Sequence, residues 1–167
     1  MTMTTRALIW ILGLALANAA SAGLQPFDAD AFDAIRARYA SEPVLLLLWS
    51  LDCHHCKAGM ARAAEHLAEQ PELNLVLVNV DASEDAQAVA HTLQALGLAD
   101  ADNWQFIDAP AARLRASIDP QWYGELPRSY LIDGNGHLEG FSGRLTPGFF
   151  DHWHHLNRAV RAELVPR

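Results

Sequence analysis

Two cysteines, Cys53 and Cys56, are the only ones in this 167-residue chain, and His54 and His55 separate them. A disulfide between them would close a very small loop and add only about 2 kcal/mol of stability in the chain-entropy model. A domain of this length can bury a core large enough to fold without it. We therefore interpret the pair as a reactive centre, because a thiolate attacks disulfides and a second nearby cysteine resolves the mixed disulfide that results.

The pair lies between two contrasting segments. Residues 44–49 form a continuous apolar run, typical of a strand buried on both faces, and a helical pattern extends from the pair to about residue 70. The first cysteine would then lie at a helix N-terminus, where unpaired N–H groups and the helix dipole favour an anion. We predict a lowered thiol pKa and the attacking role for Cys53, and the resolving role for Cys56.

The neighbouring side chains influence how readily the thiolate forms. His54 and His55 can donate hydrogen bonds or carry positive charge beside Cys53, which stabilises the reduced form and makes the disulfide more oxidising. Asp52 has the opposite effect, because its carboxylate disfavours a second negative charge. The helix terminus and His55 are better oriented, so we expect a net lowering of the thiol pKa.

The rest of the chain alternates strand and helix patterns before ending in a hairpin and a helix. Strands are expected at 44–49, 73–80, 104–107, 128–132 and 137–141, and helices at 28–39, from the cysteines to 70, from 83 to 97, at 110–118 and at 146–164. Asp133-Gly134-Asn135-Gly136 is typical of a hairpin turn. This order predicts an α/β fold with a mixed central β-sheet flanked by helices.

Two segments carry a resemblance to a known family. Residues 48–57, with Trp49 before the cysteines and Lys57 after them, resemble the active-site segment of thioredoxin-like proteins, and residues 123–136 resemble the segment around their cis-proline. The chain most resembles the exported TlpA-like branch, which includes the cytochrome c maturation reductases. The resemblance covers nearly all of residues 23–167 and implies a thioredoxin fold, with an extra strand and helix at about 100–118 inserted before the cis-proline.

The resemblance also implies where a substrate binds. Pro127 would be the cis-proline facing the disulfide, and the backbone of Leu126 would pair with an extended substrate segment. Trp49 and Trp122 would line the same groove with Leu126. The alternative for Pro127 is an ordinary trans-proline at the start of a strand.

Some positions depart from the family pattern. Thioredoxins carry a buried acid six residues before the first cysteine, where this chain has Leu47. The resemblance therefore leaves Cys56 without its usual proton acceptor. Glu125 is the best substitute, with His54 or His55 as the next candidates.

Two further departures leave the direction of electron flow open. Asp52 replaces the usual tryptophan before the first cysteine, and Gly59 stands where many TlpA-like proteins have glutamate. We expect a periplasmic disulfide reductase that acts on protein thiols and disulfides. An oxidant or isomerase of the same fold is the alternative.

The N-terminus has the pattern of an export signal. Arg6 precedes an apolar run, and Ala20-Ser21-Ala22 forms a cleavage site of the Ala-x-Ala type. The run is shorter than the roughly 20 residues that span a bilayer comfortably. We therefore predict a signal peptide at 1–22 and one domain at 23–167, exported to the periplasm, with an uncleaved N-terminal membrane anchor as the alternative.

Composition limits the partners. The chain has a formal net charge of −8, which disfavours binding to nucleic acid. We expect a monomer without a cofactor that exchanges electrons with a membrane or soluble redox partner as well as its substrates.

Two other functions remain open at this stage. The cysteines and one histidine could hold a soft ion such as Cu(I), although adjacent residues cannot enclose a tetrahedral zinc. His152, His154 and His155 form a second histidine group, which we interpret as a solvated helix face rather than a metal site. A thioredoxin fold used only for docking is the other alternative.

Overall fold

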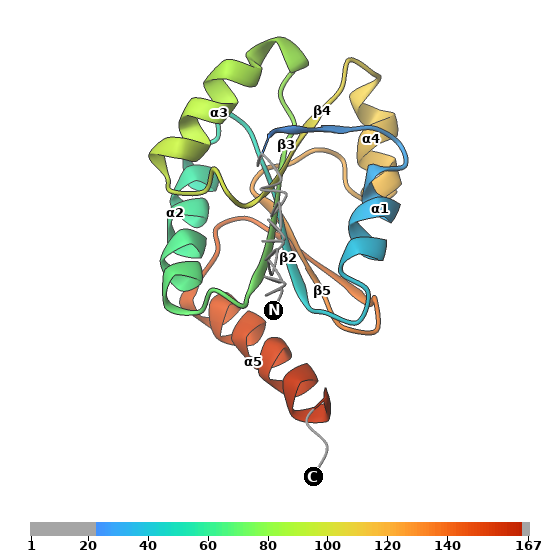
Figure 1. Ribbon diagram of the computed structural model, residues 1–167. Coiled ribbons are helices and arrows are strands. Elements are labelled where there is room, and N and C mark those ends of the chain that lie inside the picture. The colour runs from blue at the N-terminus through green and yellow to red at the C-terminus, as the bar shows by residue number, and fades with distance from the viewer. Residues whose placement is uncertain (1–22, 165–167) are drawn as a thin grey trace, which may run out of the picture.

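The computed structural model describes residues 23–164, which form one sheet covered by helices on both faces (Figure 1). The strands are β1 (Gln25–Phe27), β2 (Val44–Trp49), β3 (Asn74–Asn79), β4 (Asp102–Phe106), β5 (Arg128–Ile132) and β6 (Leu138–Ser142). The helices are α1 (Ala31–Arg38), α2 (His54–Glu69), α3 (Ala86–Ala95), α4 (Ala111–Ile118) and α5 (Pro147–Leu164), with a 3-10 turn at Ser83–Asp85 before α3.

The sheet is mixed, and its strand order is β1-β4-β3-β2-β5-β6. The first four strands in this order run parallel, whereas β5 is antiparallel to β2 and to β6. Every residue of β2 is buried, as its unbroken apolar run predicts for a central strand. The cysteine pair therefore begins where the best-buried strand of the molecule ends.

Each face of the sheet has its own core. Alternate side chains of β2 contribute to each one, because successive residues of a strand point to opposite faces. Leu45, Leu47 and Trp49 pack under α2, α3 and α5, and Val44, Leu46 and Leu48 pack under α1 and α4. Figure 1 shows α2 and α3 on one side of the sheet and α1 and α4 on the other.

The predicted elements are present, with differences at their ends. The edge strand β1 was not expected, because three residues carry no alternating pattern and β1 exists only through its pairing with β4. Helix α1 begins at Ala31 rather than residue 28, and β4 covers 102–106 rather than 104–107. The mixed α/β architecture is confirmed, whereas reading β4 and α4 as an insertion stays a prediction.

The β5–β6 turn follows the expected turn chemistry. Gly136 has a φ of +79°, a conformation that glycine adopts without the steric cost of a side chain. The Asp133 carboxylate accepts hydrogen bonds from the backbone N–H groups of Asn135 and His137, at 2.9 and 2.8 Å. These contacts set the hairpin that carries Pro127 at its base.

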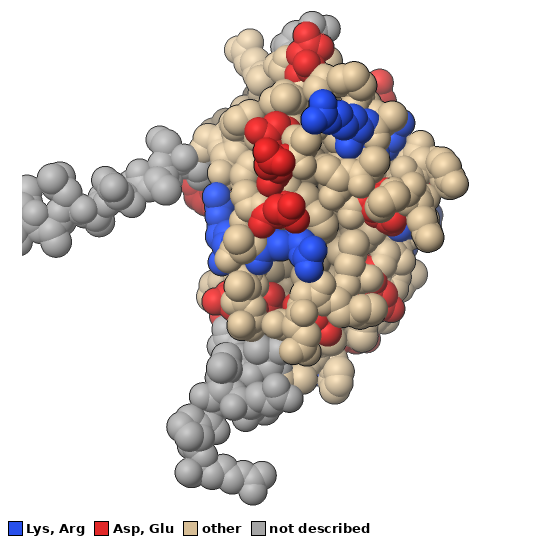
Figure 2. All heavy atoms as spheres, turned by 90° about the vertical axis from the view of Figure 1, so that its right-hand side faces the viewer, with Lys and Arg blue, Asp and Glu red and all other residues tan. Residues whose placement is uncertain are grey.

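Charges on the α1 and α4 side of the molecule are mixed. Figure 2 shows acidic and basic side chains next to one another there rather than gathered into a patch of one sign. Arg38 and Asp102 form an ion pair at 2.7 Å.

The predicted signal peptide at 1–22 lies outside the residues that the structure describes. Within 23–164, no helix has the length and apolar content that crossing a membrane requires.

Candidate active site

Cys53 and Cys56 form a disulfide at the start of α2, with their Cα atoms 5.2 Å apart. Cys53 is the N-cap residue of the helix, and its Sγ accepts from the Cys56 backbone N–H at 3.2 Å. Cys53 is half-buried, whereas only 4% of Cys56 is exposed. Cys53 is therefore the more exposed of the two cysteines, and Cys56 is shielded from solvent.

The loop that leads into the cysteines is held by β3. The Asp81 carboxylate accepts from the Leu51 backbone N–H at 2.7 Å and from the Asn79 side-chain amide at 2.9 Å. Asn79 is fully buried, and Asp81 is half-buried. The sequence pattern does not single out Asp81; its one signal is its place just after a buried strand, next to β2.

Pro127 lies against the redox pair. The Leu126–Pro127 peptide bond is cis, and Pro127 lines a cavity of about 10 Å³ together with His55 and Cys56. Leu126 is half-buried and packs against both cores. Residues far apart in the sequence thus meet at one end of the sheet.

Glu125, the predicted proton acceptor, is engaged elsewhere. Ser142 donates a hydrogen bond to its carboxylate at 2.8 Å, and Arg128 lies 3.6 Å from the same oxygen. Partial desolvation opposes the shift, but this hydrogen bond and the Arg128 charge hold the pKa of Glu125 below its usual value. These contacts make it a weak base for Cys56.

Arg128 also ties the proline loop to the sheet. Its guanidinium donates to Asp119 at 2.8 Å and lies 4.6 Å from the centre of the Tyr130 ring. The Tyr130 hydroxyl donates to the same Asp119 carboxylate at 3.0 Å. Arg128 therefore positions the residue next to it, Pro127, although nothing in the sequence pattern singled it out.

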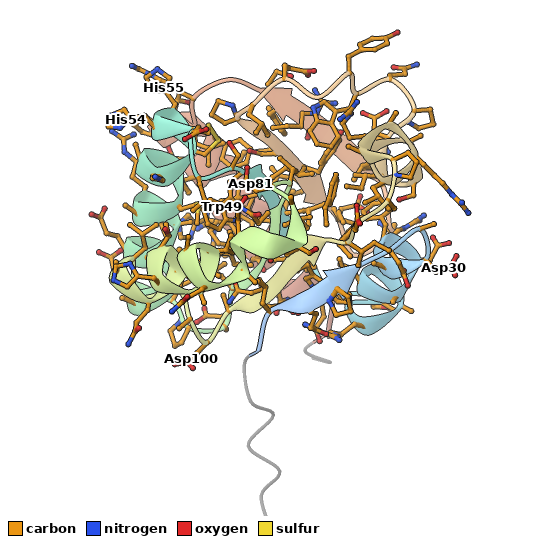
Figure 3. The ribbon with its side chains drawn as sticks, turned by 90° about the horizontal axis from the view of Figure 1, so that it is seen from above. Asp30, Trp49, His54, His55, Asp81 and Asp100 are labelled. Carbon is orange, nitrogen blue, oxygen red and sulfur yellow. A yellow bond between two sulfur atoms is a disulfide. The ribbon has the colours of Figure 1, made fainter. Side chains whose placement is uncertain are left out.

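His54 and His55 lie on the surface. Figure 3 shows both rings pointing away from the body of the molecule at the start of α2, and neither ring bonds to a described side chain in this disulfide form. Both line an open groove of about 440 Å³, with Arg62 and Arg144 beside them. His55 also faces the small cavity beside Cys56, but His54 does not.

The two expected groove tryptophans are core residues. Trp49 is 1% exposed and Trp122 is 3% exposed, so both support the site from beneath rather than forming an open surface. The Trp122 indole donates to the Glu125 backbone carbonyl at 3.0 Å. Tyr123, in the same loop, is 88% exposed.

Burial explains one departure from the family pattern. Gly59 is buried in α2, and a Cβ there would lie 3.3 Å from Leu145 Cδ1. A glutamate at this position would require Leu145 to move. The glycine therefore matches the packing of α2 against the segment before α5.

The histidines of α5 do not form one group. His154 is buried and contacts the His66 ring at 2.9 Å, whereas His152 lies 3.0 Å from Glu139 at the surface. The expected solvated face thus applies to His152 and His155, and His154 belongs to the contact between α2 and α5. Within the described part of the chain, no three metal-binding side chains come together.

Known proteins with a similar sequence or structure were found for this chain. No family model matches the chain. A thiol–disulfide oxidoreductase of Bacillus subtilis, YkuV, is 29% identical over 101 residues, which is 60% of this chain and 66% of the relative, just under two thirds of its length.

Solved structures match over more of the chain. A secreted disulfide oxidoreductase of Mycobacterium tuberculosis, homologous to E. coli DsbE, has a TM-score of 0.52 at 18% identity, over 75% of this chain and 85% of that one. A thioredoxin family thiol:disulfide interchange protein of Chlorobium tepidum gives 0.55 at 16% identity, over 73% and 83%. The chain has a thioredoxin fold. The predicted fold is confirmed, and the thioredoxin fold places Cys53 and Pro127 at the same end of the sheet.

Proposed function

We propose that this protein is a thiol–disulfide oxidoreductase that reduces disulfides in other proteins through Cys53 and Cys56. The observation that carries the proposal is the cysteine pair at the start of α2, with one sulfur accessible and one buried beside Pro127. The helix terminus favours a thiolate at Cys53. The similarity to a thiol–disulfide oxidoreductase over 101 residues supports the same activity.

The reaction proceeds through a mixed disulfide. The Cys53 thiolate attacks one sulfur of a partner disulfide, and the partner's other sulfur leaves as a thiolate. Cys56 then loses its proton and attacks the Cys53 sulfur, which restores the Cys53–Cys56 disulfide and releases the second partner sulfur. Two electrons pass to the partner, and its thiolates take up protons from solvent.

His55 is the proposed acceptor of the Cys56 proton. Its ring is exposed to solvent and faces the cavity that Cys56 lines, so it can pass the proton outward. An imidazole is the side chain whose ordinary pKa, about 6.5, suits proton transfer near neutral pH. Glu125 is a poorer candidate, because Ser142 and Arg128 already engage its carboxylate.

The partner's disulfide segment is proposed to bind in an extended form at Leu126. Among the described residues, the backbone N–H and C=O of Leu126 have no hydrogen-bond partner, so both can pair with an incoming strand. Such pairing binds many sequences, because it uses main-chain groups. Trp49 and Trp122 support this groove from the core.

The setting of the activity is also part of the proposal. We expect residues 1–22 to direct export to the periplasm, residues 23–167 to act there as a monomer, and a membrane or soluble redox partner to reduce the pair again. The export signal in the sequence supports this setting. The matched Mycobacterium tuberculosis protein is itself described as secreted.

The test is to assay single cysteine variants of residues 23–167. Cys53→Ser and Cys56→Ser should each abolish reduction of insulin disulfides, and only Cys56→Ser should accumulate a mixed disulfide with the substrate, because it keeps the attacking sulfur. Full activity in either variant would contradict the proposal. Unchanged circular dichroism of both variants is the control for folding.

A further inference from the structure

Two buried polar groups near Cys56 have no hydrogen-bond partner among the described residues. They are the Ser129 hydroxyl and the Trp49 indole N–H, on residues that are each 1% exposed. Both residues line the small cavity of about 10 Å³ that Cys56 and Pro127 also line. Buried polar groups are almost always hydrogen-bonded, so two unpaired ones around one cavity need an explanation.

Strand register brings Ser129 to this place. Ser129 is paired directly with Leu47 across the antiparallel β2–β5 ladder, and residues paired in this way point to the same face of the sheet. Leu47 belongs to the core beneath α2 and supplies no polar atom. Ser129 therefore presents its side chain on the α2 face of the sheet, opposite Leu47.

The surroundings of Cys56 disfavour its thiolate. The sulfur is buried and lies 3.9 Å from the Leu48 carbonyl oxygen, whose negative end favours a protonated sulfur. Desolvation acts in the same direction. A thiolate at Cys56 therefore needs hydrogen-bond donors on its other side. Ser129 and Trp49 line the cavity beside Cys56, and each carries one unpaired donor.

We propose that Ser129 and Trp49 are positioning residues that stabilise the Cys56 thiolate during resolution of the mixed disulfide. The cavity of about 10 Å³ is at the lower limit of what one water molecule needs, and such a water would accept from Trp49, bond to Ser129 and donate to the sulfur. The Cys56 proton passes to His55 and then to solvent, and the thiolate attacks Cys53. This inference rests on the proposed function.

The first measurement is the pKa of Cys56 in the Cys53→Ser background, followed by thiolate ultraviolet absorbance against pH. Adding Ser129→Ala should raise the pKa by about one unit, since hydrogen bonds to charged groups are the strong ones. Trp49→Phe should raise it in the same direction. Because this background cannot form a disulfide, the result is independent of whether the proposed exchange activity exists.

The second measurement isolates the resolving step. The reduced protein is mixed with 5,5′-dithiobis(2-nitrobenzoate), which loads Cys53, and release of the second thionitrobenzoate reports attack by Cys56. At pH values below the thiol pKa, Ser129→Ala should slow this phase roughly tenfold. Its pH profile should shift to higher pH by about one unit. Ser129→Thr, which keeps the hydroxyl, should restore the profile.

Matched controls separate this role from a structural one. Ser117→Ala removes a hydroxyl of α4 that donates to Leu114, and Trp153→Phe removes a buried, unpaired indole N–H that does not line this cavity. Both should leave the pKa and the rate unchanged. An unchanged Cys56 pKa in both Ser129→Ala and Trp49→Phe, or equal shifts in the controls, would overturn the proposal.

Stability of the disulfide form gives a further check. Since the Ser129 hydroxyl has no partner among the described residues, Ser129→Ala should unfold at the same denaturant concentration as the parent protein or at a higher one. A marked loss of stability would show that the hydroxyl serves the fold, and it would overturn the assignment.

Discussion

The two cysteines are unequal because the chain buries them differently. Cys53 caps α2 and is half-buried, whereas Cys56 lies one turn inside the helix at 4% exposure. Attack by the Cys53 sulfur therefore depends on how easily a partner reaches it and on the helix terminus. Attack by the Cys56 sulfur depends on how its buried proton is removed. The histidines between them face solvent, and only His55 also faces the cavity beside Cys56.

At this scale we expect the two histidines to differ. His55→Asn should slow the resolving step roughly tenfold near pH 7, because general base catalysis by a side chain contributes at least that much. His54→Asn is the matched control and should change the rate less than twofold on the same scale. Stopped-flow release of the second thionitrobenzoate measures both, and equal effects of the two variants would remove His55 from the proton path.

At the scale of elements, the active-site loop depends on β3. Asp81 accepts from Leu51 and Asn79, so Asp81→Ala should leave a loop N–H and a fully buried amide each short of a partner. We expect a loss of about 1–3 kcal/mol in the free energy of unfolding of the disulfide form. Exposed Asp100→Ala is the control, and urea unfolding is the measurement. Equal midpoints for the two variants would show that the loop does not rely on Asp81.

The contact between α2 and α5 should respond to pH. Burial, followed by repulsion from His66 and Arg158, lowers the pKa of His154, and Asp151 and Glu69 only partly oppose this. The ring also contacts the His66 ring and the Gln70 side chain, both at 2.9 Å. The folded state therefore favours neutral His154, because protonation would place a charge in this buried contact.

The lowered pKa of His154 determines how stability changes with pH. The stabilisation is complete above the ordinary imidazole pKa of 6.5 and is lost as the pH falls below it, because the unfolded chain binds the proton more readily. We expect the free energy of unfolding to fall on acidification below pH 6.5, and to fall less in His154→Gln. The control variant is His91→Gln, at an exposed position, and its free energy of unfolding should fall with pH as steeply as that of the parent protein. An equally steep fall in His154→Gln would contradict this account.

The main elements could be predicted because their patterns are local. The apolar run of β2, the stripe of α5 and the hairpin turn before β6 each occupy one continuous segment. The edge strand β1 could not, because its three residues are ordered by pairing with β4. Helix α1 was predicted three residues too early, since Asp28 and Asp30 are both plausible caps.

The candidate site divides in the same way. Cys53 and Cys56 could be predicted from their spacing. The resemblance to thioredoxins adds Pro127 to the predicted site. Asp81 offers only the weak signal of its place after a buried strand, and Ser129 offers none, because both meet the site through contacts with a neighbouring strand. Glu125 was a reasonable expectation, but the contacts from Ser142 and Arg128 form only in the folded hairpin.

At the scale of the whole molecule, the thioredoxin fold separates stability from chemistry. Two cores, one on each face of the sheet, pack around β2, so we expect the fold to persist when the disulfide at its end is reduced. Solved structures of the same fold at 13–24% identity show that this architecture tolerates wide changes in sequence.

The central claim is that the Cys53–Cys56 disulfide is redox-active rather than structural, and its reduction potential tests that claim most directly. Residues 23–167 would be equilibrated with glutathione buffers, and the free thiols trapped and counted. We expect a reversible two-electron transition between about −270 and −120 mV, at the thioredoxin end of that range for a reductase. A potential below about −300 mV, typical of structural disulfides, would contradict it.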